Sequence, residues 1–313
     1  MENLIENISF FLGVSSFEID KYANPNPYYF YYKKIAIPKR NGNKRLVYVP
    51  IPELKRIQHF ICEQYLSNIK ISDRCYAYVR KKSICDNAKQ HKDNRCFLFV
   101  DITDFFGSLS FDIMEAVLIK RLNDVLSPQD INLLLRLCSY KGKFVQGCVS
   151  SPILSNIYMT EIDYCFSNLV NILPNGIYSR YSDDMVFSSS ERIKNSLLNT
   201  IKKALKKYGL TINYKKTYFS SYLERIKITG LRLKNDKTIS ISTSYKKALK
   251  NSIHAKLKFL QNSRESCDNL LGKLSYLKMV DLPYYNSLNT KYRDGKVLLI
   301  DRLKKIRLEE HKD

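Results

Sequence analysis

The sequence lacks the features of a membrane-spanning or secreted protein. Of its 313 residues, 44% are hydrophobic, yet no run is long and apolar enough to span a bilayer. The N-terminal residues Met1 to Glu6 include two acids and lack the basic start of a signal peptide. We therefore expect a cytoplasmic protein, a single enzyme of two or three closely joined subdomains around a sizeable core.

Zinc ligands and paired cysteines are also scarce. The chain has four histidines and eight cysteines, and no cysteine pair has C-x-x-C spacing. Structural zinc sites need clustered ligands, so this scarcity argues against one. Disulfides are not expected in a cytoplasmic chain of this size. We interpret the cysteines as reduced, small apolar residues.

Acidic residues are too few to balance the bases. Fifty-two Lys and Arg against thirty Asp and Glu give a net charge of +22, and residues 201–256 alone hold fifteen bases and two acids. A merely soluble surface does not require such concentration in one segment. The excess indicates a polyanionic partner, either nucleic acid or an anionic membrane surface. Twenty-three tyrosines add aromatic faces on which bases could stack.

The predicted elements mix helices and strands, which indicates an α+β fold. The apolar run Cys96 to Val100 predicts a buried strand that ends at Asp101. Residues 177–181 and 185–188 predict two strands around a tight turn. The other expected elements are a hairpin of residues 28–37 and 45–49 around Asn41-Gly42-Asn43, helices at 52–68, 128–140 and 190–208, and a mostly helical, basic region after Thr243.

Three aspartates occupy the ends of these strands. Asp101 ends the buried strand, and Asp183 with Asp184 forms the hairpin tip. A turn allows adjacent side chains to converge, so carboxylates from two neighbouring strands could meet. Hard oxygen ligands suit Mg²⁺, and two such ions can activate an attacking hydroxyl and stabilise a leaving phosphate. Nucleotidyl transfer needs that arrangement.

The context of the three aspartates resembles the reverse transcriptase family, with five motifs in the family's order across residues 28–232. The segments are Phe99-Val100-Asp101-Ile102-Thr103-Asp104-Phe105-Phe106 (motif A), Gln146-Gly147-Cys148-Val149-Ser150-Ser151-Pro152-Ile153-Leu154-Ser155-Asn156 (motif B), Tyr181-Ser182-Asp183-Asp184 (motif C), Gly209-Leu210-Thr211-Ile212-Asn213-Tyr214-Lys215-Lys216-Thr217 (motif D) and Ile228-Thr229-Gly230-Leu231 (motif E). Ser182 stands where family members often carry Ala or Val, and a small serine should be tolerated.

The resemblance implies a right-hand polymerase with fingers, an antiparallel palm and a helical thumb. We expect an N-terminal helical segment at 1–27, fingers and palm at 28–238, and a basic, RNA-binding thumb at 239–313. The family's substrates are dNTPs and its cofactor is a pair of Mg²⁺ ions. Asp101 and Asp183 would hold both ions, with Asp184 and the backbone carbonyl of Ile102 as further ligands.

Other roles carried over by the resemblance concern the nucleotide. Phe106 would lie under the incoming sugar and reject a 2′-OH, with Phe105 as its partner in the core. Gln146 and Gly147 would face the nucleotide and the templating base, and glycine permits close backbone approach. Lys216, or alternatively Lys215, would neutralise or protonate the leaving pyrophosphate. Arg45 and Arg80 would contact the triphosphate or the template.

A second signature resembles bacterial retron reverse transcriptases. Asn87, Ala88 and His91 match their N-A-x-x-H pattern, and Thr229 with Gly230 lies in a triplet resembling their V-T-G. His91 as a structural residue capping a helix is compatible with this resemblance. From the short length of the chain we expect no RNase H or maturase domain after the thumb.

The retron resemblance implies particular partners. Such enzymes bind their own noncoding RNA (msr-msd) and begin DNA synthesis from a guanosine 2′-OH. The product is branched multicopy single-stranded DNA (msDNA). Such systems act in anti-phage defence together with an effector protein. Host RNase H would trim the template, and no membrane partner is expected. The alternatives are a defence-associated reverse transcriptase outside the retrons and a catalytically idle RNA-binding scaffold.

Overall fold

A computed structural model of the chain describes residues 3–24, 26, 28–38, 42, 44–221, 226–259 and 266–310. The chain forms two compact units, each made of two separate segments. The first unit comprises Met1–Lys82 and Cys96–Phe219, and the second comprises Ser83–Arg95 and Ser220–Asp313. The contacts therefore divide the chain near residue 220, before the predicted start of the thumb at 239, and place 83–95 with the C-terminal unit.

A four-stranded sheet is the centre of the first unit, in the order β4-β5-β3-β6. Its strands are β3 (Cys96–Asp101), β4 (Ile177–Tyr181), β5 (Asp184–Ser189) and β6 (Tyr218–Ser221), of which Tyr218 and Phe219 belong to this unit. β5 pairs antiparallel with both β3 and β4, and residues of β3 and β5 are largely buried, as their apolar runs predict.

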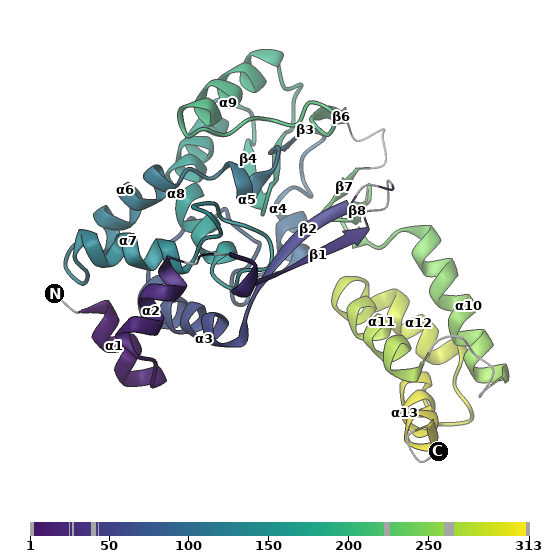
Figure 1. The fold of residues 1–313 in the computed structure, drawn as a ribbon. Helices are drawn as coiled ribbons and strands as arrows, with labels where there is room; N and C mark the ends of the chain where they lie inside the picture. Colours follow the sequence, from purple (N-terminus) through teal and green to yellow (C-terminus); the bar gives the residue numbers. More distant parts are fainter. Residues whose placement is uncertain are drawn as a thin grey trace. The chain divides into compact units, whose positions relative to one another are not determined.

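Helices of the first unit pack mainly against one another, and one of them packs against β4 of the sheet (Figure 1). They are α3 (Pro52–Ile61), α5 (Phe105–Ser108), α6 (Phe111–Leu122), α7 (Pro128–Leu137), α8 (Ser151–Leu169) and α9 (Asn195–Lys207). Proline at the first helical turn and serine N-caps explain several starts; Ser127 caps α7 through the backbone N–H of Asp130. α8 contacts both β4 and α9, so it is the main support of the sheet.

The N-terminal part of the first unit is a pair of short helices followed by a hairpin. α1 (Leu4–Leu12) and α2 (Ser16–Ala23) are separated at Gly13, which has φ of 65°. The predicted hairpin is formed by β1 (Tyr32–Pro38) and β2 (Lys44–Pro50), with Lys34 opposite Tyr48, whereas Tyr28–Phe30, expected in the first strand, form a short 3-10 helix. Asn41 and Asn43 of its predicted turn lie outside the described residues.

The second unit combines one early helix with the C-terminal part of the chain. α4 (Ile84–Gln90) packs on a small sheet of order β7-β8-β9, formed by β7 (Lys227–Ile228), β8 (Leu231–Leu233) and β9 (Ile239–Ser240). The helices that follow are α10 (Thr243–Phe259), α11 (Cys267–Val280), α12 (Leu282–Lys291) and α13 (Leu299–Glu310). Lys246 bonds Asp281, which joins α10 to the start of α12.

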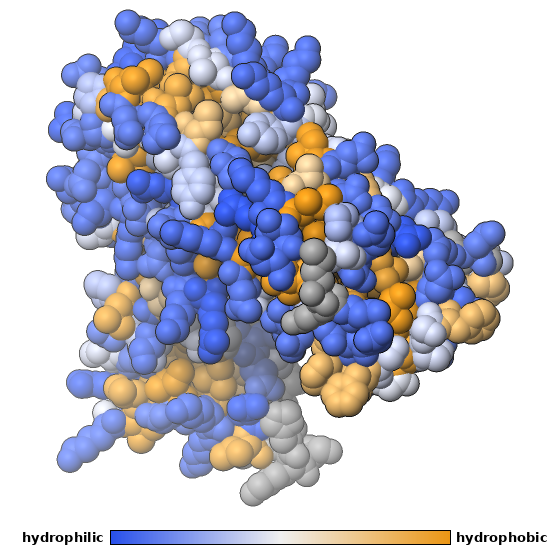
Figure 2. All heavy atoms as spheres, turned by 90° about the vertical axis from the view of Figure 1, so that its left-hand side faces the viewer, coloured by the Kyte–Doolittle hydropathy of each residue, from blue (hydrophilic) through white to orange (hydrophobic). Residues whose placement is uncertain are grey.

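Hydrophilic residues cover most of the face that Figure 2 shows. Figure 2 shows one face, on which hydrophobic residues form small groups among hydrophilic ones. Among the described residues, none of the helices combines the length and the hydropathy that a bilayer crossing requires.

Candidate active site

Asp101 is placed at the last position of β3, where the strand leaves the sheet. Its side chain is 4% exposed, and its Cα is paired in register with that of Asp184 on β5. The next residue, Ile102, donates its backbone N–H to the carbonyl oxygen of Asp183 at 3.3 Å. Motif A and the hairpin tip are therefore joined side by side, as the sequence predicts.

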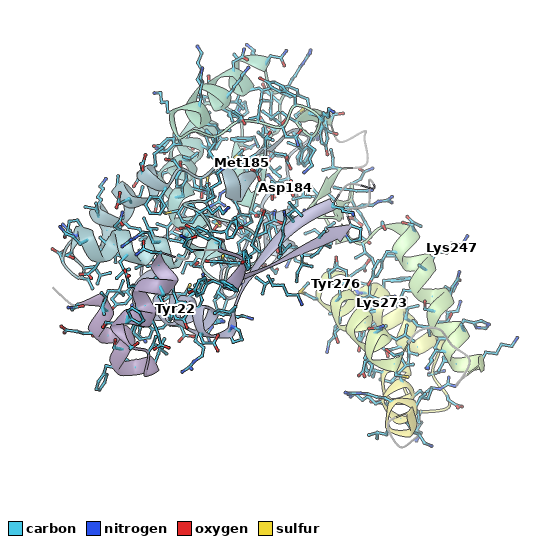
Figure 3. The ribbon with its side chains drawn as sticks, in the orientation of Figure 1. Tyr22, Asp184, Met185, Lys247, Lys273 and Tyr276 are labelled. Atoms are coloured by element: carbon cyan, nitrogen blue, oxygen red, sulfur yellow. The ribbon has the colours of Figure 1, made fainter. Side chains whose placement is uncertain are left out.

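The turn between β4 and β5 carries the other two aspartates. Ser182 has φ of 61°, in the left-handed region that non-glycine residues rarely adopt. Asp183 follows half-buried, and Asp184 is exposed at the start of β5, where Figure 3 labels it. The turn reverses the chain within two residues, so both carboxylates stay close to Asp101.

The electrostatics show that these carboxylates crowd one another. Burial raises the pKa of Asp183, and the charge of Asp101 raises it further. Loss of solvation, followed by the charges of Asp183 and Asp101, raises the pKa of Asp184 to about 6. Because the Asp184 side chain is exposed, repulsion from its two charged neighbours accounts for most of this rise in pKa. Cations at this point would relieve that repulsion.

One cation from the chain already lies there. The Lys216 ammonium donates to Asp101 Oδ2 at 2.6 Å, and this bond raises the pKa of Lys216. The backbone explains its position, since Asn213 N–H donates to the Asp101 carbonyl at 2.8 Å and Lys216 N–H donates to that of Asn213. Lys215 is exposed and outside the lining of the cavity described next, so the structure brings Lys216, not Lys215, to the carboxylates.

A cavity of about 1010 Å³ in the first unit opens over these residues. Phe106 lies half-buried on its wall, with its ring centroid 5.3 Å from that of Phe105, which is buried in the core. The predicted site residues that line the cavity are Arg45, Asp101, Ile102, Phe106, Gln146, Gly147, Asp183 and Lys216. Arg80 is exposed and is not among the lining residues.

Gly147 has a specific steric reason to be glycine. Its φ is 110°, and a Cβ there would overlap the Tyr48 carbonyl oxygen and Val47 Cγ1. Tyr48 also donates its backbone N–H to the carbonyl of Gln146 at 2.7 Å. The close backbone approach expected at Gly147 is therefore made by β2, which fixes the motif B loop against the hairpin.

The donor set fits divalent ions, although it is not preassembled. In the part of the chain that the structure describes, no three His, Cys, Asp or Glu side chains form a ready metal cluster. Lys216 instead occupies Asp101 Oδ2. Asp101, Asp183 and Asp184 supply only hard oxygen ligands, which suit Mg²⁺. Because Lys216 is 61% exposed on its side chain, it can leave Asp101 without disturbing the core.

A buried network of charged and polar side chains lies behind the turn, and the sequence did not predict it. Arg180 donates to both carboxylate oxygens of Asp163, at 2.9 and 2.8 Å, and both side chains are fully buried. Arg180 Nη1 also donates to the carbonyl of Ser182 and to Asn156 Oδ1, each at 3.2 Å. Tyr178 donates its hydroxyl to Asp163 at 2.7 Å. An arginine within an otherwise buried strand was the available signal.

The residues of the second signature lie together in the second unit. Asn87 and Ala88 are buried in α4, and His91 is its C-cap, with its backbone N–H on the carbonyl of Ala88. Thr229 and Gly230 form the β7–β8 turn with positive φ, and the Thr229 hydroxyl donates to the Ile84 carbonyl at 3.3 Å. The two segments, about 140 residues apart in the chain, thus form one structural element.

Comparison with known proteins gives consistent matches. Residues 37–233 match the family model described as reverse transcriptase (RNA-dependent DNA polymerase). Retron Ec83 reverse transcriptase of Escherichia coli is 29% identical over 87% of this chain and 90% of its own length. Retron Mx65 reverse transcriptase of Myxococcus xanthus is 25% identical over 88% and 68%.

Among solved structures, apo telomerase from Candida tropicalis is similar in fold, with a TM-score of 0.52 and 13% identity over 83% of this chain and 57% of that chain. The predicted α+β class is confirmed.

Proposed function

Because this chain belongs to the reverse transcriptase (RNA-dependent DNA polymerase) family, we propose that it is a retron enzyme that copies part of its own noncoding RNA into DNA. Synthesis starts from a guanosine 2′-OH of that RNA and gives branched msDNA. Its similarity to retron reverse transcriptases over most of its length supports this. The observation that carries the proposal is the meeting of Asp101 and Asp183 with Lys216 at one cavity, with Asp184 paired in register with Asp101 beside it.

The residues at the cavity have separate roles in nucleotidyl transfer. Asp101, Asp183 and Asp184, with the Ile102 carbonyl, would hold two Mg²⁺ ions, which supply activation of the attacking hydroxyl and charge neutralisation at the phosphates. Lys216 moves from Asp101 toward the leaving pyrophosphate and neutralises or protonates it. The ammonium is suited to this because it is exposed and already lies within the site.

Residues in and around the cavity would select and position the dNTP. Phe106 presents its ring to the sugar and excludes a 2′-OH by contact. Gln146 and Gly147 also line the cavity, and the bond from Tyr48 to Gln146 holds them in place. Arg45, exposed on β2 at the cavity, contacts the triphosphate, and Arg80 contacts the template outside the cavity.

RNA binding is assigned to the helices that follow residue 239. On α10 the exposed residues Lys247, Lys250, His254 and Lys258 follow helical spacing and share one face. This face extends about 16 Å. Lys250 lowers the pKa of Lys291 on α12, which shows that the two ammonium groups are close together. Such closely spaced cations fit the phosphates of a folded RNA, which is read mainly by shape and backbone contacts. Figure 3 labels Lys247 on α10.

The packing of α4 on the β7–β8 turn supports the retron assignment within the family. The two retron-like signatures would have no reason to meet if they were chance matches. Asn87 and His91 are buried, so they would act on the cognate RNA only indirectly, by holding together the unit that binds it. Host RNase H trims the template, and a retron effector protein acts with the complex in anti-phage defence in the bacterial cytoplasm.

The test is production of branched DNA in a bacterium that carries this gene and its upstream noncoding region. Small nucleic acids are separated on a denaturing gel before and after debranching and RNase treatment. Asp183→Asn/Asp184→Asn is the inactive variant. Asp112→Asn/Asp124→Asn, two exposed acids away from the cavity, is the charge-matched control.

We expect a discrete RNA-linked single-stranded DNA from the wild type and the control, and none from the inactive variant. If no such DNA forms while the purified protein extends a primer on an RNA template with Mg²⁺, the chain is a reverse transcriptase outside the retrons. If RNA binding persists and neither product forms, the chain is an RNA-binding scaffold.

A further inference from the structure

The catalytic turn is contacted by a residue far away in the sequence. The Tyr78 hydroxyl lies 3.2 Å from Ser182 Oγ, a hydrogen bond between residues 104 positions apart. Both residues line the cavity of the carboxylates. Tyr78 is 54% exposed, whereas Ser182 is 7% exposed. The phenol therefore reaches from the cavity surface onto the turn that carries Asp183.

Hydrogen bonds hold in place the backbone segment that carries Tyr78. Tyr76 N–H donates to the Arg180 carbonyl, and Arg180 N–H donates to that of Arg74, both at 2.8 Å, so this segment runs along β4. Asn156 Nδ2 donates to the Ala77 carbonyl at 2.9 Å. Tyr78 itself has φ of 59°. A non-glycine residue holds this conformation only when its surroundings enforce it, which here aims the phenol at Ser182.

Ser182 is the point at which restraint of the turn matters. It also has a left-handed φ, of 61°, and it directly precedes Asp183. Arg180 holds its carbonyl group from within the core. Its hydroxyl bonds Tyr78. The turn is therefore held at two points immediately before Asp183, at the Ser182 carbonyl by Arg180 and at the Ser182 side chain by Tyr78.

We propose that Tyr78 is a positioning residue for the catalytic turn, and that it acts through the hydroxyl of Ser182 to orient Asp183. Ala or Val at position 182 could not accept this bond, so the device depends on the serine of this chain. The inference rests on the proposed role of Asp183 in polymerisation, and it requires no retron activity.

The test is primer extension on an RNA template with the purified full-length chain, over a range of Mg²⁺ concentrations. The variants are Tyr78→Phe, Ser182→Ala and the double variant. Tyr78→Phe keeps the ring and removes only the hydroxyl. Tyr164→Phe, at an exposed position of α8 away from the cavity, is the matched control. Thermal unfolding is measured for every variant.

The loss of one hydrogen bond predicts that each single variant needs roughly 2- to 10-fold more Mg²⁺ for half-maximal rate, with unfolding temperatures close to that of the wild type. The double variant should lose no more than the single variants, because both remove the same bond. An unchanged Mg²⁺ dependence, or losses that multiply, would overturn the proposal. An inactive wild type would instead refute the proposed function.

Discussion

The buried pair of Arg180 and Asp163 allows a quantitative prediction. Substitution Asp163→Asn keeps the shape of the side chain and removes its charge. The guanidinium, fully buried and held by two bonds to Asp163, would then be an uncompensated charge in the core. Breaking a buried pair in this way costs about 3–5 kcal/mol. For a unit of this size, that lowers the unfolding temperature by roughly 6–20 °C.

The same reasoning predicts a smaller loss when both charges are removed. In Arg180→Met/Asp163→Leu no charge remains buried, and the cost is limited to partners that lose a bond, such as Tyr178 and Asn156. We therefore expect the double variant to be more stable than Asp163→Asn alone. It should still lose activity, because the Ser182 carbonyl loses its donor.

Unfolding is followed by near-ultraviolet circular dichroism of tyrosine, since the chain contains no tryptophan. Hydrogen exchange of peptides from α8 and β4 assigns the change to the first unit. Substitution Asp112→Asn, at an exposed position of α6, is the control for loss of one negative charge. A cost below about 1 kcal/mol for Asp163→Asn, or a double variant less stable than the single one, would refute the reasoning.

Three further predictions concern the site and the RNA. Phe106→Ala should reduce discrimination against ribonucleotides by roughly 10- to 200-fold in competitive single-nucleotide incorporation, because its ring no longer blocks the 2′-OH. Lys247→Gln/Lys250→Gln/Lys291→Gln should lower by roughly 2 the slope of log affinity for the cognate RNA against log salt, as measured by filter binding. For Asp184, the pKa of about 6 in the folded state lies above the ordinary value of 3.8. Between pH 3.8 and about 6 the folded state therefore binds more protons than the unfolded state, and its stability falls as the pH rises through this range. Without metal, Asp184→Asn should therefore unfold at a higher temperature than the wild type at pH 8, and this difference should shrink as the pH falls below 6.

Each of these has an outcome that contradicts it. Phe106→Ala must retain dNTP incorporation, and unchanged selectivity in such a variant would exclude the steric role. The control for the RNA-binding prediction is a triple variant of exposed lysines in the first unit, Lys120→Gln/Lys194→Gln/Lys207→Gln, which removes the same charge. An equal change in the salt slope of its RNA affinity would show that the effect is not specific to α10. A stability difference for Asp184→Asn that does not vary with pH would show that crowding of carboxylates is not its cause.

The sequence predicted what local patterns specify. The run Cys96 to Val100 could only be a buried strand, and Asp101 had to fall at its end. The tight turn at Asp183 followed from two flanking strands of the right length. The register of β3 against β5 then brought the aspartates together, as expected from the motifs.

Contacts between distant segments could not be predicted in this way. Arg180 and Asp163 meet because α8 packs on β4, and nothing local to either residue names the other. Nothing in the sequence favoured Arg45 over Arg80, yet only Arg45, on β2, lines the cavity, because the path of the segment before α4 keeps Arg80 outside it. The membership of residues 83–95 in the second unit also depends on partners more than a hundred residues later.

That membership has a consequence for synthesis of the protein on the ribosome. α4 is made early, but the sheet on which it packs follows much later: the Thr229 hydroxyl donates to the Ile84 carbonyl across 145 residues. At elongation rates of about 5–20 residues per second, this interval lasts roughly 7–30 s. During it, α4 lacks this sheet, while the neighbouring strand β3 can pair within the first unit. The nascent chain must therefore keep one helix out of a folding core until most of the sequence has emerged.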